Sequence, residues 1–593
     1  MRAILVAAVF VFSLFGAQLL RVQAFDAATV QQAALTKRLQ TRTTPALRGS
    51  ILDSRGVVLA SSSERRTVTV DQTAVPEYTK TVDRKRVKVG VTAAAQDLAP
   101  LLGTTPEALA PQLMGTNRYR IVARNVTPLT WRAIQDLGVP GVLSERTTER
   151  VYPANISAAS VVGFVQADGT PGSGLEVMMD KPLSGTPGKE VYQQAGDGRM
   201  IPGAQQQDVP PVNGHGVTTT LDADLQWFAQ NAIANKVIEA GALSGYVVVM
   251  EVSTGKLRAV ASYPTFDPAN VGQAAKGDLE NHAFQDVYEP GSTGKVMSMS
   301  AAIEEGVVQP GTGLIVPNRL KRSDQSFKDD VEHGTLNLTV AGALAQSSNI
   351  GTMLATERVP PPTMEGYFRK FGIGKSTGVG YPGESDGLLA KAADWSGSQR
   401  YTLLFGQGYS LNAIQSAGVY QTIANKGLRV PPSLVEGTTA PDGTFTPATS
   451  PQGVRVVTEA TATKVSSMLE EVIGPGGTAP KAAIAGYRVA GKTGTADRYD
   501  AAVGGYSGFT ASFIGYAPAD DPKFVVAVTL QRPVNGHFGG QLGAPVFKDV
   551  MTYALQGYKV PPTGTSSPVL PLKFDVPLNP NDPAVISDKK PGG

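Results

Sequence analysis

The 593-residue chain contains no cysteine. This absence excludes disulfide bonds, zinc sites with thiolate ligands and cysteine nucleophiles, and it suits a location outside the cytoplasm. Histidine is also scarce: none of the four (His215, His282, His333 and His537) forms a pair at metal-ligand spacing. A serine hydrolase that depends on histidine therefore has no support, and we expect any proton shuttle to use another residue type.

A strong charge of one sign is missing too. Lys and Arg number 53 and Asp and Glu 50, which leaves a net charge of +3. The densest basic stretches, residues 84–88 and 146–150, are short and fit solvated loops. We therefore expect no nucleic-acid partner. A hydrophobic fraction of 41% with 17% charged residues is typical of ordered globular protein, and the length predicts three or four units.

The N-terminus carries an apolar run. Residues 3–20 contain no charge and only two polar side chains, Ser13 and Gln18. As a helix the run spans about 27 Å, close to the ~30 Å thickness of a bilayer core. A cleaved signal peptide is the alternative, since small residues lie at 22–24, but the run is longer than a secretory core and Arg21 interrupts the approach to the cleavage site. We predict a single-pass anchor at residues 1–21 of a cell-membrane protein, with a cytoplasmic N-terminus because Arg2 precedes the span, and an extracytoplasmic remainder.

Two folded regions and a tail are expected after the anchor. Residues 22–215 should form a first, elongated domain, with a helical stalk at 25–45, short strands at 50–53, 57–60 and 67–71, helices at 92–99 and 106–114, and an irregular glycine-rich part at 160–215. Residues 561–593 are rich in proline and are predicted to be a tail without a core.

Residues 216–560 have the pattern of an α+β domain. Asp222 is the predicted cap of a long amphipathic helix that ends at residue 238. The predicted strands are 217–221, 244–253, 256–263, 487–490, 509–517 and 524–531, and helical and turn-rich sequence fills 290–430. Strands at both ends with helices between them predict one antiparallel sheet packed by helices.

Three S-x-x-K tetrads offer a serine and a lysine one helical turn apart, as an activated serine nucleophile requires. They begin at Ser253, Ser292 and Ser587. The first lies in a predicted hairpin turn and the last in the tail. Only Ser292 and Lys295 follow a turn and open a helix, predicted over 292–305, where free backbone N–H groups and the helix dipole favour an anion. Ser292 as a simple helix cap remains the alternative at this point.

Two further motifs follow. Ser347-Ser-Asn349 comes after a short helical stretch, and Ser410-Leu-Asn412 repeats the same S-x-N pattern, so either is also explained as a helix cap. Lys492-Thr493-Gly494 is the only K-[ST]-G in the chain and continues a predicted strand. The first members of the three motifs are separated by 55 and 145 residues. The order S-x-x-K, S-x-N, K-T-G is that of penicillin-binding proteins and related β-lactamases.

The whole chain resembles a class B penicillin-binding protein. The stretch from Arg48 to Ala60 is similar to the R-G-x-I-x-D-R-x-G-x-x-L-A element of that class, with departures at Ser54 and Arg55. Other similar stretches are Gly174-Leu-Glu176 with Leu183-Ser-Gly185, Thr220-Leu-Asp222 with Leu225-Gln226, and Phe405-Gly-Gln-Gly408. The short first domain and the proline-rich end look most like the septal, division-specific enzyme of actinobacteria. Those relatives usually carry a longer basic cytoplasmic segment, so a misplaced start codon or a divergent paralogue is expected.

The resemblance implies a penicillin-binding transpeptidase or serine β-lactamase-like fold on a pedestal domain. It implies that Ser292 attacks D-Ala-D-Ala and that Lys295 is its base, because burial and the nearby Lys492 both favour a neutral amine. It further implies that Ser347 relays the proton and that Asn349 bonds to the substrate amide and to Lys295. The backbone N–H groups of Ser292 and Thr495 would hold the oxyanion, and Lys492 and Thr493 would anchor the substrate's terminal carboxylate. Thr493, Gly494 and Thr495 would bind the substrate.

The implied partners are peptidoglycan stem peptides, lipid-linked precursor strands, β-lactam antibiotics and a membrane glycosyltransferase of the division machinery. Neither a metal nor an organic cofactor is expected. Two other functions stay open from sequence: a D,D-carboxypeptidase or β-lactam-hydrolysing enzyme with the same motifs, and a non-catalytic division scaffold.

Overall fold

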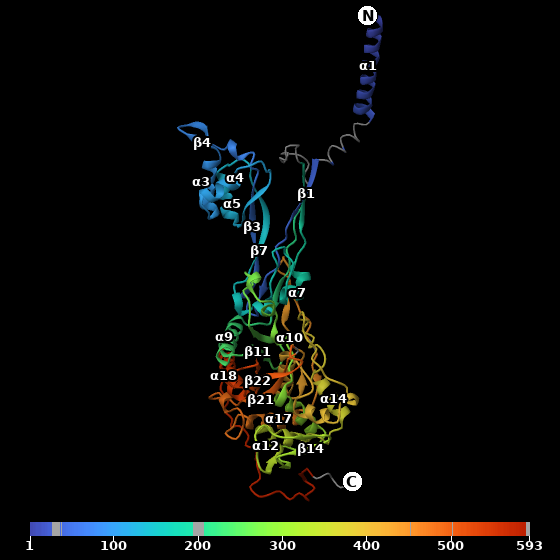
Figure 1. Cartoon of the computed structure of the whole chain (residues 1–593), viewed down its shortest axis with the longest axis vertical. Helices are drawn as coiled ribbons and strands as arrows, with labels where there is room; N and C mark the ends of the chain where they lie inside the picture. The colour runs from blue at the N-terminus through green and yellow to red at the C-terminus, as the bar shows by residue number, and fades with distance from the viewer. Residues whose placement is uncertain are drawn as a thin grey trace. The chain divides into compact units, whose positions relative to one another are not determined.

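The computed structural model describes residues 1–25, 32, 36, 38–193, 207–450, 452–500 and 502–588, and it divides into two compact units (Figure 1). The first comprises Met1–Gly49, Ser62–Arg150 and Lys181–His215; the second comprises Ser50–Ser61, Val151–Asp180 and Gly216–Gly593. The sequence instead predicted one boundary between the two folded domains, after residue 215. The short strand β2 (Ile51–Leu52) belongs to the second unit because it pairs in parallel with β10 (Gly216–Thr219).

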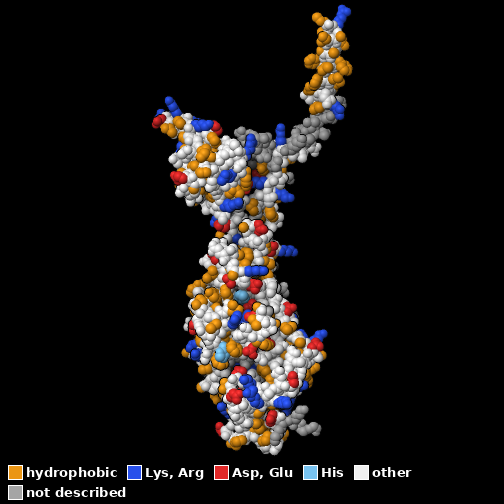
Figure 2. Space-filling view, viewed as in Figure 1, with side chains coloured by type: hydrophobic (Ala, Val, Ile, Leu, Met, Phe, Trp, Pro, Cys, Tyr) orange, Lys and Arg blue, Asp and Glu red, His pale blue; other side chains and the backbone are white. Residues whose placement is uncertain are grey.

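Helix α1 (Arg2–Leu20) has no buried side chain. Hydrophobic side chains cover it (Figure 2). By length and composition, Arg2–Gln23 is the one helix within the described residues that would cross a membrane. The chain thus has a candidate single-pass anchor. The predicted stalk at 25–45 falls partly outside the described residues, and its last part is wrong: β1 (Leu39–Thr44) is a strand paired with β8 (Gly188–Gln193).

The core of the first unit lies between a long strand and three helices. Strand β3 (Val58–Val70) pairs there with β6 (Arg120–Val126) and β7 (Val142–Val151). The two predicted strands at 57–60 and 67–71 are therefore one. Helices α3 (Gly90–Leu102), α4 (Pro106–Leu113) and α5 (Pro128–Asp136) bury apolar side chains such as Leu98, Leu109 and Trp131 with Val68. Caps by Thr105 and Thr127, each followed by proline, start the last two helices. The unit also holds β4 (Thr79–Val82), β5 (Lys85–Lys88) and β9 (Gln207–Val209).

A five-stranded antiparallel sheet forms the centre of the second unit, in the order β12-β11-β23-β22-β21. Its strands are β11 (Ser244–Glu251), β12 (Leu257–Tyr263), β21 (Ala490–Asp500), β22 (Gly505–Ala517) and β23 (Phe524–Gln531). The predicted antiparallel sheet is confirmed. Both faces of β11 and β23 are buried, which is why each reads as a continuous apolar run rather than an alternating one.

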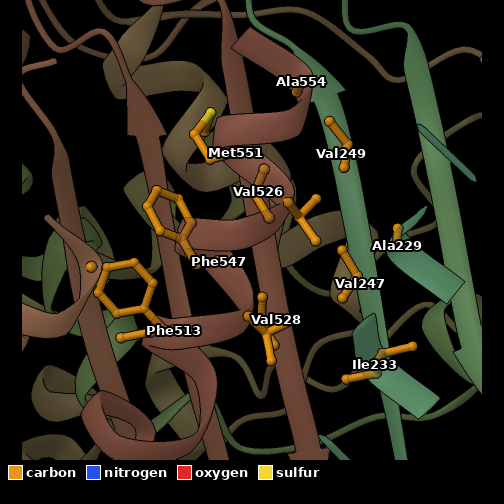
Figure 3. Close-up of a cluster of buried hydrophobic side chains, with 14 of the residues drawn as sticks. Ala229, Ile233, Val247, Val249, Phe513, Val526, Val528, Phe547, Met551 and Ala554 are labelled. Carbon is orange, nitrogen blue, oxygen red and sulfur yellow. The ribbon is translucent and has the colours of Figure 1, made fainter. Parts of the chain in front are cut away.

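Helices cover both faces of this sheet. On one face, α9 (Ala223–Ala240) and α18 (Gly539–Gly557) pack against β11, β22 and β23, and Phe513, Val526 and Phe547 lie together in that core (Figure 3). Asp222 caps α9 as predicted, through hydrogen bonds from two backbone N–H groups. Helix α16 (Ala413–Ala424) packs on the other face.

The segment between the early and late strands of the sheet carries most of the remaining elements. Its helices are α10 (His282–Gln285), α11 (Lys295–Glu304), α12 (Val340–Ala345), α13 (Asn349–Thr356), α14 (Pro361–Lys370), α15 (Gln399–Thr402) and α17 (Glu459–Glu471). Short strands also occur there: β13 (Gly313–Val316), β14 (Leu320–Arg322), β15 (Gln325–Phe327), β16 (Leu336–Thr339), β17 (Leu428–Arg429), β18 (Val435–Thr439), β19 (Phe445–Pro447) and β20 (Val454–Arg455). The prediction that helices and turns fill residues 290–430 was therefore incomplete. Before the sheet lie α6 (Ala159–Val162), α7 (Gly174–Met178) and α8 (Asp180–Leu183).

The C-terminal segment was predicted to be a tail without a core, but its described residues, 561–588, form a strap on the second unit. Strand β24 (Val585–Ile586) pairs in parallel with β13. The carbonyl of Leu572 accepts a hydrogen bond of 3.1 Å from the Thr339 N–H. A Cβ on Gly342 would lie 1.9 Å from that carbonyl oxygen, so the close approach requires glycine there. Backbone pairing holds this proline-rich segment although it supplies little apolar surface.

Candidate active site

The turn that carries Ser292 is the first part of the site. Gly291–Gly294 is a 3₁₀ turn and α11 starts at Lys295, three residues later than predicted. Ser292 is 7% exposed. Gly291 has φ +54°, and a Cβ on it would lie 3.1 Å from the Thr495 carbonyl oxygen. Glycine therefore serves both the left-handed backbone and the close approach of strand β21 to the turn.

Lys295 lies one turn further along and is completely buried. Its Nζ donates a 2.5 Å hydrogen bond to the carbonyl of Ser347 and is 3.4 Å from the Ser347 hydroxyl. Burial lowers the pKa of Lys295 to about 8, against an opposing influence of Asp329 and Asp330. About a tenth of this lysine is thus neutral at pH 7, far more than of a solvated lysine, and a proton acceptor must be neutral.

Ser347 occupies the junction between α12 and α13 with φ +64°, a conformation that costs a non-glycine residue free energy. Its hydroxyl accepts a 2.9 Å hydrogen bond from Lys492 Nζ and lies 3.4 Å from Lys295 Nζ. One hydroxyl therefore touches both amines. Three residues that are far apart in sequence meet at this atom.

Lys492 belongs to β21, the edge strand of the central sheet, and is also completely buried. Its Nζ lies 3.2 Å from both the carbonyl and the hydroxyl oxygen of Thr493. Burial, followed by the positive charge of Lys295, holds the pKa of Lys492 well below its usual range. The charge of Lys295 thus disfavours the charged form of Lys492.

The next residues of β21 lie along the turn at Gly291–Gly294, which we call the nucleophile turn. The Thr493 hydroxyl is 2.8 Å from that of Thr478. A Cβ on Gly494 would lie 2.4 Å from Ser512 Oγ and 2.9 Å from the Pro290 carbonyl oxygen, so only glycine fits between strand and turn. Thr495 Oγ1 accepts a 3.4 Å hydrogen bond from the Gly539 N–H. The outer edge of β21 has no partner strand among the described elements, and an extended peptide would be able to pair with it.

Asn349 differs from its prediction. Its Nδ2 donates 3.4 Å hydrogen bonds to the Lys328 carbonyl and to Asp330, and not to Lys295. The reason is that the loop at 328–330 packs on the start of α13. Asp329 in that loop accepts hydrogen bonds from the Ser348 hydroxyl at 2.6 Å and from the Ile350 N–H at 2.9 Å. Sequence reasoning missed both aspartates, because no local pattern shows that their loop folds onto α13.

The competing motifs have other structural roles. In the first tetrad, Lys256 Nζ makes a 2.8 Å ion pair with Glu436, and the Ser253 hydroxyl points to Glu251 at 3.5 Å. Asn412 forms a capping box with Gln415 at the start of α16. The third tetrad reaches residues 589–590, which lie outside the described part of the chain.

Comparisons with known proteins agree with this geometry. The penicillin-binding protein transpeptidase domain matches residues 245–552, and the penicillin-binding protein dimerisation domain matches residues 43–219. The chain is 36% identical to penicillin-binding protein PbpB of Mycolicibacterium smegmatis, over 94% of this chain and 90% of the relative. It is 32% identical to peptidoglycan D,D-transpeptidase FtsI of Escherichia coli, over 86% of this chain and 84% of the relative.

Solved structures show the same fold. A peptidoglycan synthetase from Bifidobacterium adolescentis superposes with a TM-score of 0.73 at 32% identity, covering 91% of this chain and 100% of that one. Penicillin-binding protein 3 of Mycobacterium tuberculosis in complex with ampicillin superposes with a TM-score of 0.70 at 31% identity. The match covers 90% of this chain and 100% of that one. The chain therefore belongs to the penicillin-binding protein transpeptidase family. Its dimerisation domain and its PbpB- and FtsI-type relatives make it a class B member of the septal type.

Proposed function

We propose that this class B penicillin-binding protein is a serine-type D-Ala-D-Ala transpeptidase that cross-links peptidoglycan stem peptides, with Ser292 as nucleophile and Lys295 as its base. The observation that carries the assignment is the completely buried Lys295, with a pKa lowered to about 8, one turn after Ser292 and against the Ser347 hydroxyl. Such an amine takes a proton from a serine hydroxyl far more readily than a solvated lysine does.

Acylation follows from these positions. Neutral Lys295 takes the Ser292 proton while Ser292 Oγ attacks the carbonyl carbon between the two D-alanines. The oxyanion is held by the backbone N–H groups of Ser292 and Thr495, each typically worth about 10²–10³ in rate. When the C–N bond breaks, the proton passes from Lys295 through the Ser347 hydroxyl to the departing D-alanine nitrogen. The amine of a second stem peptide then attacks the ester carbonyl, and its proton passes through the Ser347 hydroxyl to Lys295. The Ser292 Oγ–acyl bond breaks, and Lys295 returns a proton to Ser292 Oγ.

Substrate is held on the edge of β21. Lys492, Thr493 and Gly494 anchor the terminal carboxylate, and the strand edge pairs with the peptide backbone. Asn349 uses its amide nitrogen within the protein, which leaves Oδ1 to accept from the substrate amide. Asn349 thus acts from the start of α13, where the loop at 328–330 holds its amide, and without a bond to Lys295. β-Lactams imitate the D-Ala-D-Ala end and acylate Ser292 in the same way.

The cellular setting is septal wall synthesis. The N-terminus is cytoplasmic, and α1 crosses the membrane once. The region that matches the dimerisation domain, 43–219, forms the pedestal, and the transpeptidase domain after it works outside on lipid-linked precursor strands. A membrane glycosyltransferase of the division machinery supplies the glycan strands. These assignments rest on the apolar N-terminal helix and on the FtsI- and PbpB-type relatives.

The test is the intact mass of the full-length protein after exposure to a fluorescent penicillin. Wild type should gain one adduct, and Ser292→Ala none. Ser253→Ala is the matched control, because it changes the serine of the first tetrad, and it should label like wild type. An adduct on Ser292→Ala would refute the assignment of the nucleophile.

A further inference from the structure

Glu289, three residues before Ser292, joins three segments of the second unit. Its Oε1 accepts a 2.9 Å hydrogen bond from the Gly408 N–H and a 3.2 Å bond from the Tyr506 hydroxyl. The same two loops also meet through the backbone, because the Gly291 N–H donates to the Gly406 carbonyl at 2.9 Å. The glutamate thus links the nucleophile turn to the loop at 406–408 and to β22.

The second oxygen of the Glu289 carboxyl group lies inside the protein. Within the described residues, Glu289 Oε2 is buried without a hydrogen-bond partner, and so is the hydroxyl of Tyr409. That hydroxyl lies 2.2 Å from where a Cβ on Gly294 would be, so it reaches the base of the nucleophile turn. Burial is the main cause that raises the pKa of Glu289, and a nearby Asp497 acts in the same direction. The surroundings therefore do not demand a charged side chain at this position.

The link to β22 matters because the proposed oxyanion site has two halves. One N–H belongs to Ser292 on the turn and the other to Thr495 on β21. β21 and β22 form one hairpin, in which Tyr499 is directly opposite Tyr506. The hydrogen bond that the Tyr506 hydroxyl donates to Glu289 therefore links the nucleophile turn to the hairpin that carries the second N–H. A misplacement of about 1 Å in such a site costs about 10²-fold in rate.

We propose that Glu289 is a positioning residue for acylation, which keeps the Ser292 turn in register with strand β21 by accepting hydrogen bonds from Gly408 and Tyr506. It acts through its acceptor oxygen and not through its charge. The inference rests on the proposed function, since it assigns Glu289 to the acylation step of that reaction.

The experiment measures acylation of the full-length protein by a fluorescent penicillin, separating the first-order acylation rate from the concentration that half-saturates it. Glu289→Ala should lower the rate about 10- to 100-fold, because the turn loses its link, with the half-saturating concentration within about 3-fold of wild type. Glu289→Gln should stay within about 3-fold of wild type in both, because its amide oxygen accepts the same two hydrogen bonds. This rescue separates an acceptor role from a role of the charge.

The chain offers a matched control at the far end of α11. Glu305, just after the end of α11, accepts a 2.6 Å hydrogen bond from the Tyr367 hydroxyl. Glu305→Ala removes the same type of tyrosine–carboxylate bond far from Ser292, and its acylation rate should equal that of wild type. An equal loss of rate in both alanine variants would mean general destabilisation and would overturn the proposal.

Two other results would also overturn it: a wild-type acylation rate in Glu289→Ala, or a Glu289→Gln rate as low as that of Glu289→Ala. If Glu289→Ala does not fold, Tyr506→Phe is measured instead, because it removes one hydrogen-bond donor from a partly exposed side chain. A wild-type acylation rate in Tyr506→Phe refutes the proposal. A loss of about 3-fold or more supports it. Failure of the proposed function looks different, because wild type itself would then form no adduct at Ser292.

Discussion

The tetrapeptide Ser-Thr-Gly-Lys occurs twice in the second unit, and the two copies lie in opposite environments. The copy at 253–256 lies where β11 turns into β12, and the side chain of Lys256 is 34% exposed and paired with Glu436. In the copy at 292–295, Lys295 is completely buried and bonds to Ser347 instead of to a carboxylate. The same four residues thus give a charged surface lysine in one place and a weakly basic one in the other. Burial and partners, and not the motif, create the base.

The largest expected effect comes from replacing the lysine of each tetrad. Lys295→Ala should lower the acylation rate by about 10²–10⁴-fold, which is the usual contribution of a general base. Lys256→Ala should leave the rate unchanged because that lysine only forms an ion pair. Rates of labelling by fluorescent penicillin measure both, and equal rates for the two variants would contradict the assignment of the base.

The pH dependence of acylation is the next largest effect. Lys295 must be neutral to accept the proton, and its pKa is lowered to about 8. The rate should therefore rise about tenfold per pH unit well below pH 8 and level off above it. A profile from pH 6 to 9, with unfolding monitored at each pH, checks this. A rate that is flat over the range would show that deprotonation of Lys295 does not limit acylation.

A smaller change should come from the loop at 328–330. Asp330 raises the pKa of Lys295 and also opposes the lowering at Lys492. Asp330→Asn keeps the shape of the side chain and removes its charge, so both lysines should lose protons more easily. The acid limb of the pH profile should move to lower pH. Asp324→Asn, a neighbouring aspartate outside these contacts, is the control, and a shift to higher pH in Asp330→Asn would refute the electrostatic explanation.

The smallest effect concerns the stability contributed by the first tetrad. Glu436→Gln weakens its 2.8 Å ion pair with Lys256, and a partly exposed pair of this kind contributes about 0.2–1 kcal/mol. The free energy of unfolding, measured with denaturant, should fall by that amount while acylation is unaffected. A loss of acylation would give the first tetrad a role in the reaction that its position does not suggest.

Local signals in the sequence located much of the second unit. The cap at Asp222 marked the start of α9, whose end was predicted at residue 238, two residues early, and the apolar runs marked β11 and β23. The spacing of the three motifs selected the group in which Lys295, Ser347 and Lys492 meet. The roles of these residues stay predictions, since only their positions have been established.

Features that depend on distant contacts escaped prediction. Residues 561–593 were predicted to be a tail without a core because they are rich in proline, yet β24 in this segment pairs with β13, far back in the chain. Asp329 acts only where the loop at 328–330 folds onto α13, and no local pattern shows that fold. The same holds for Asn349, whose amide turns to this loop instead of to Lys295.

The position of β23 in the central sheet has a consequence for the newly made protein. β23 lies between β11 and β22, so it joins the earliest strands of the sheet to the latest ones. Synthesis runs from the N-terminus, and Ser292 is therefore made long before residue 531 completes the sheet. Until then the nucleophile turn has no strand β21 seated beside it. A chain interrupted part-way through translation would carry its serine but remain inert toward stem peptides and antibiotics alike.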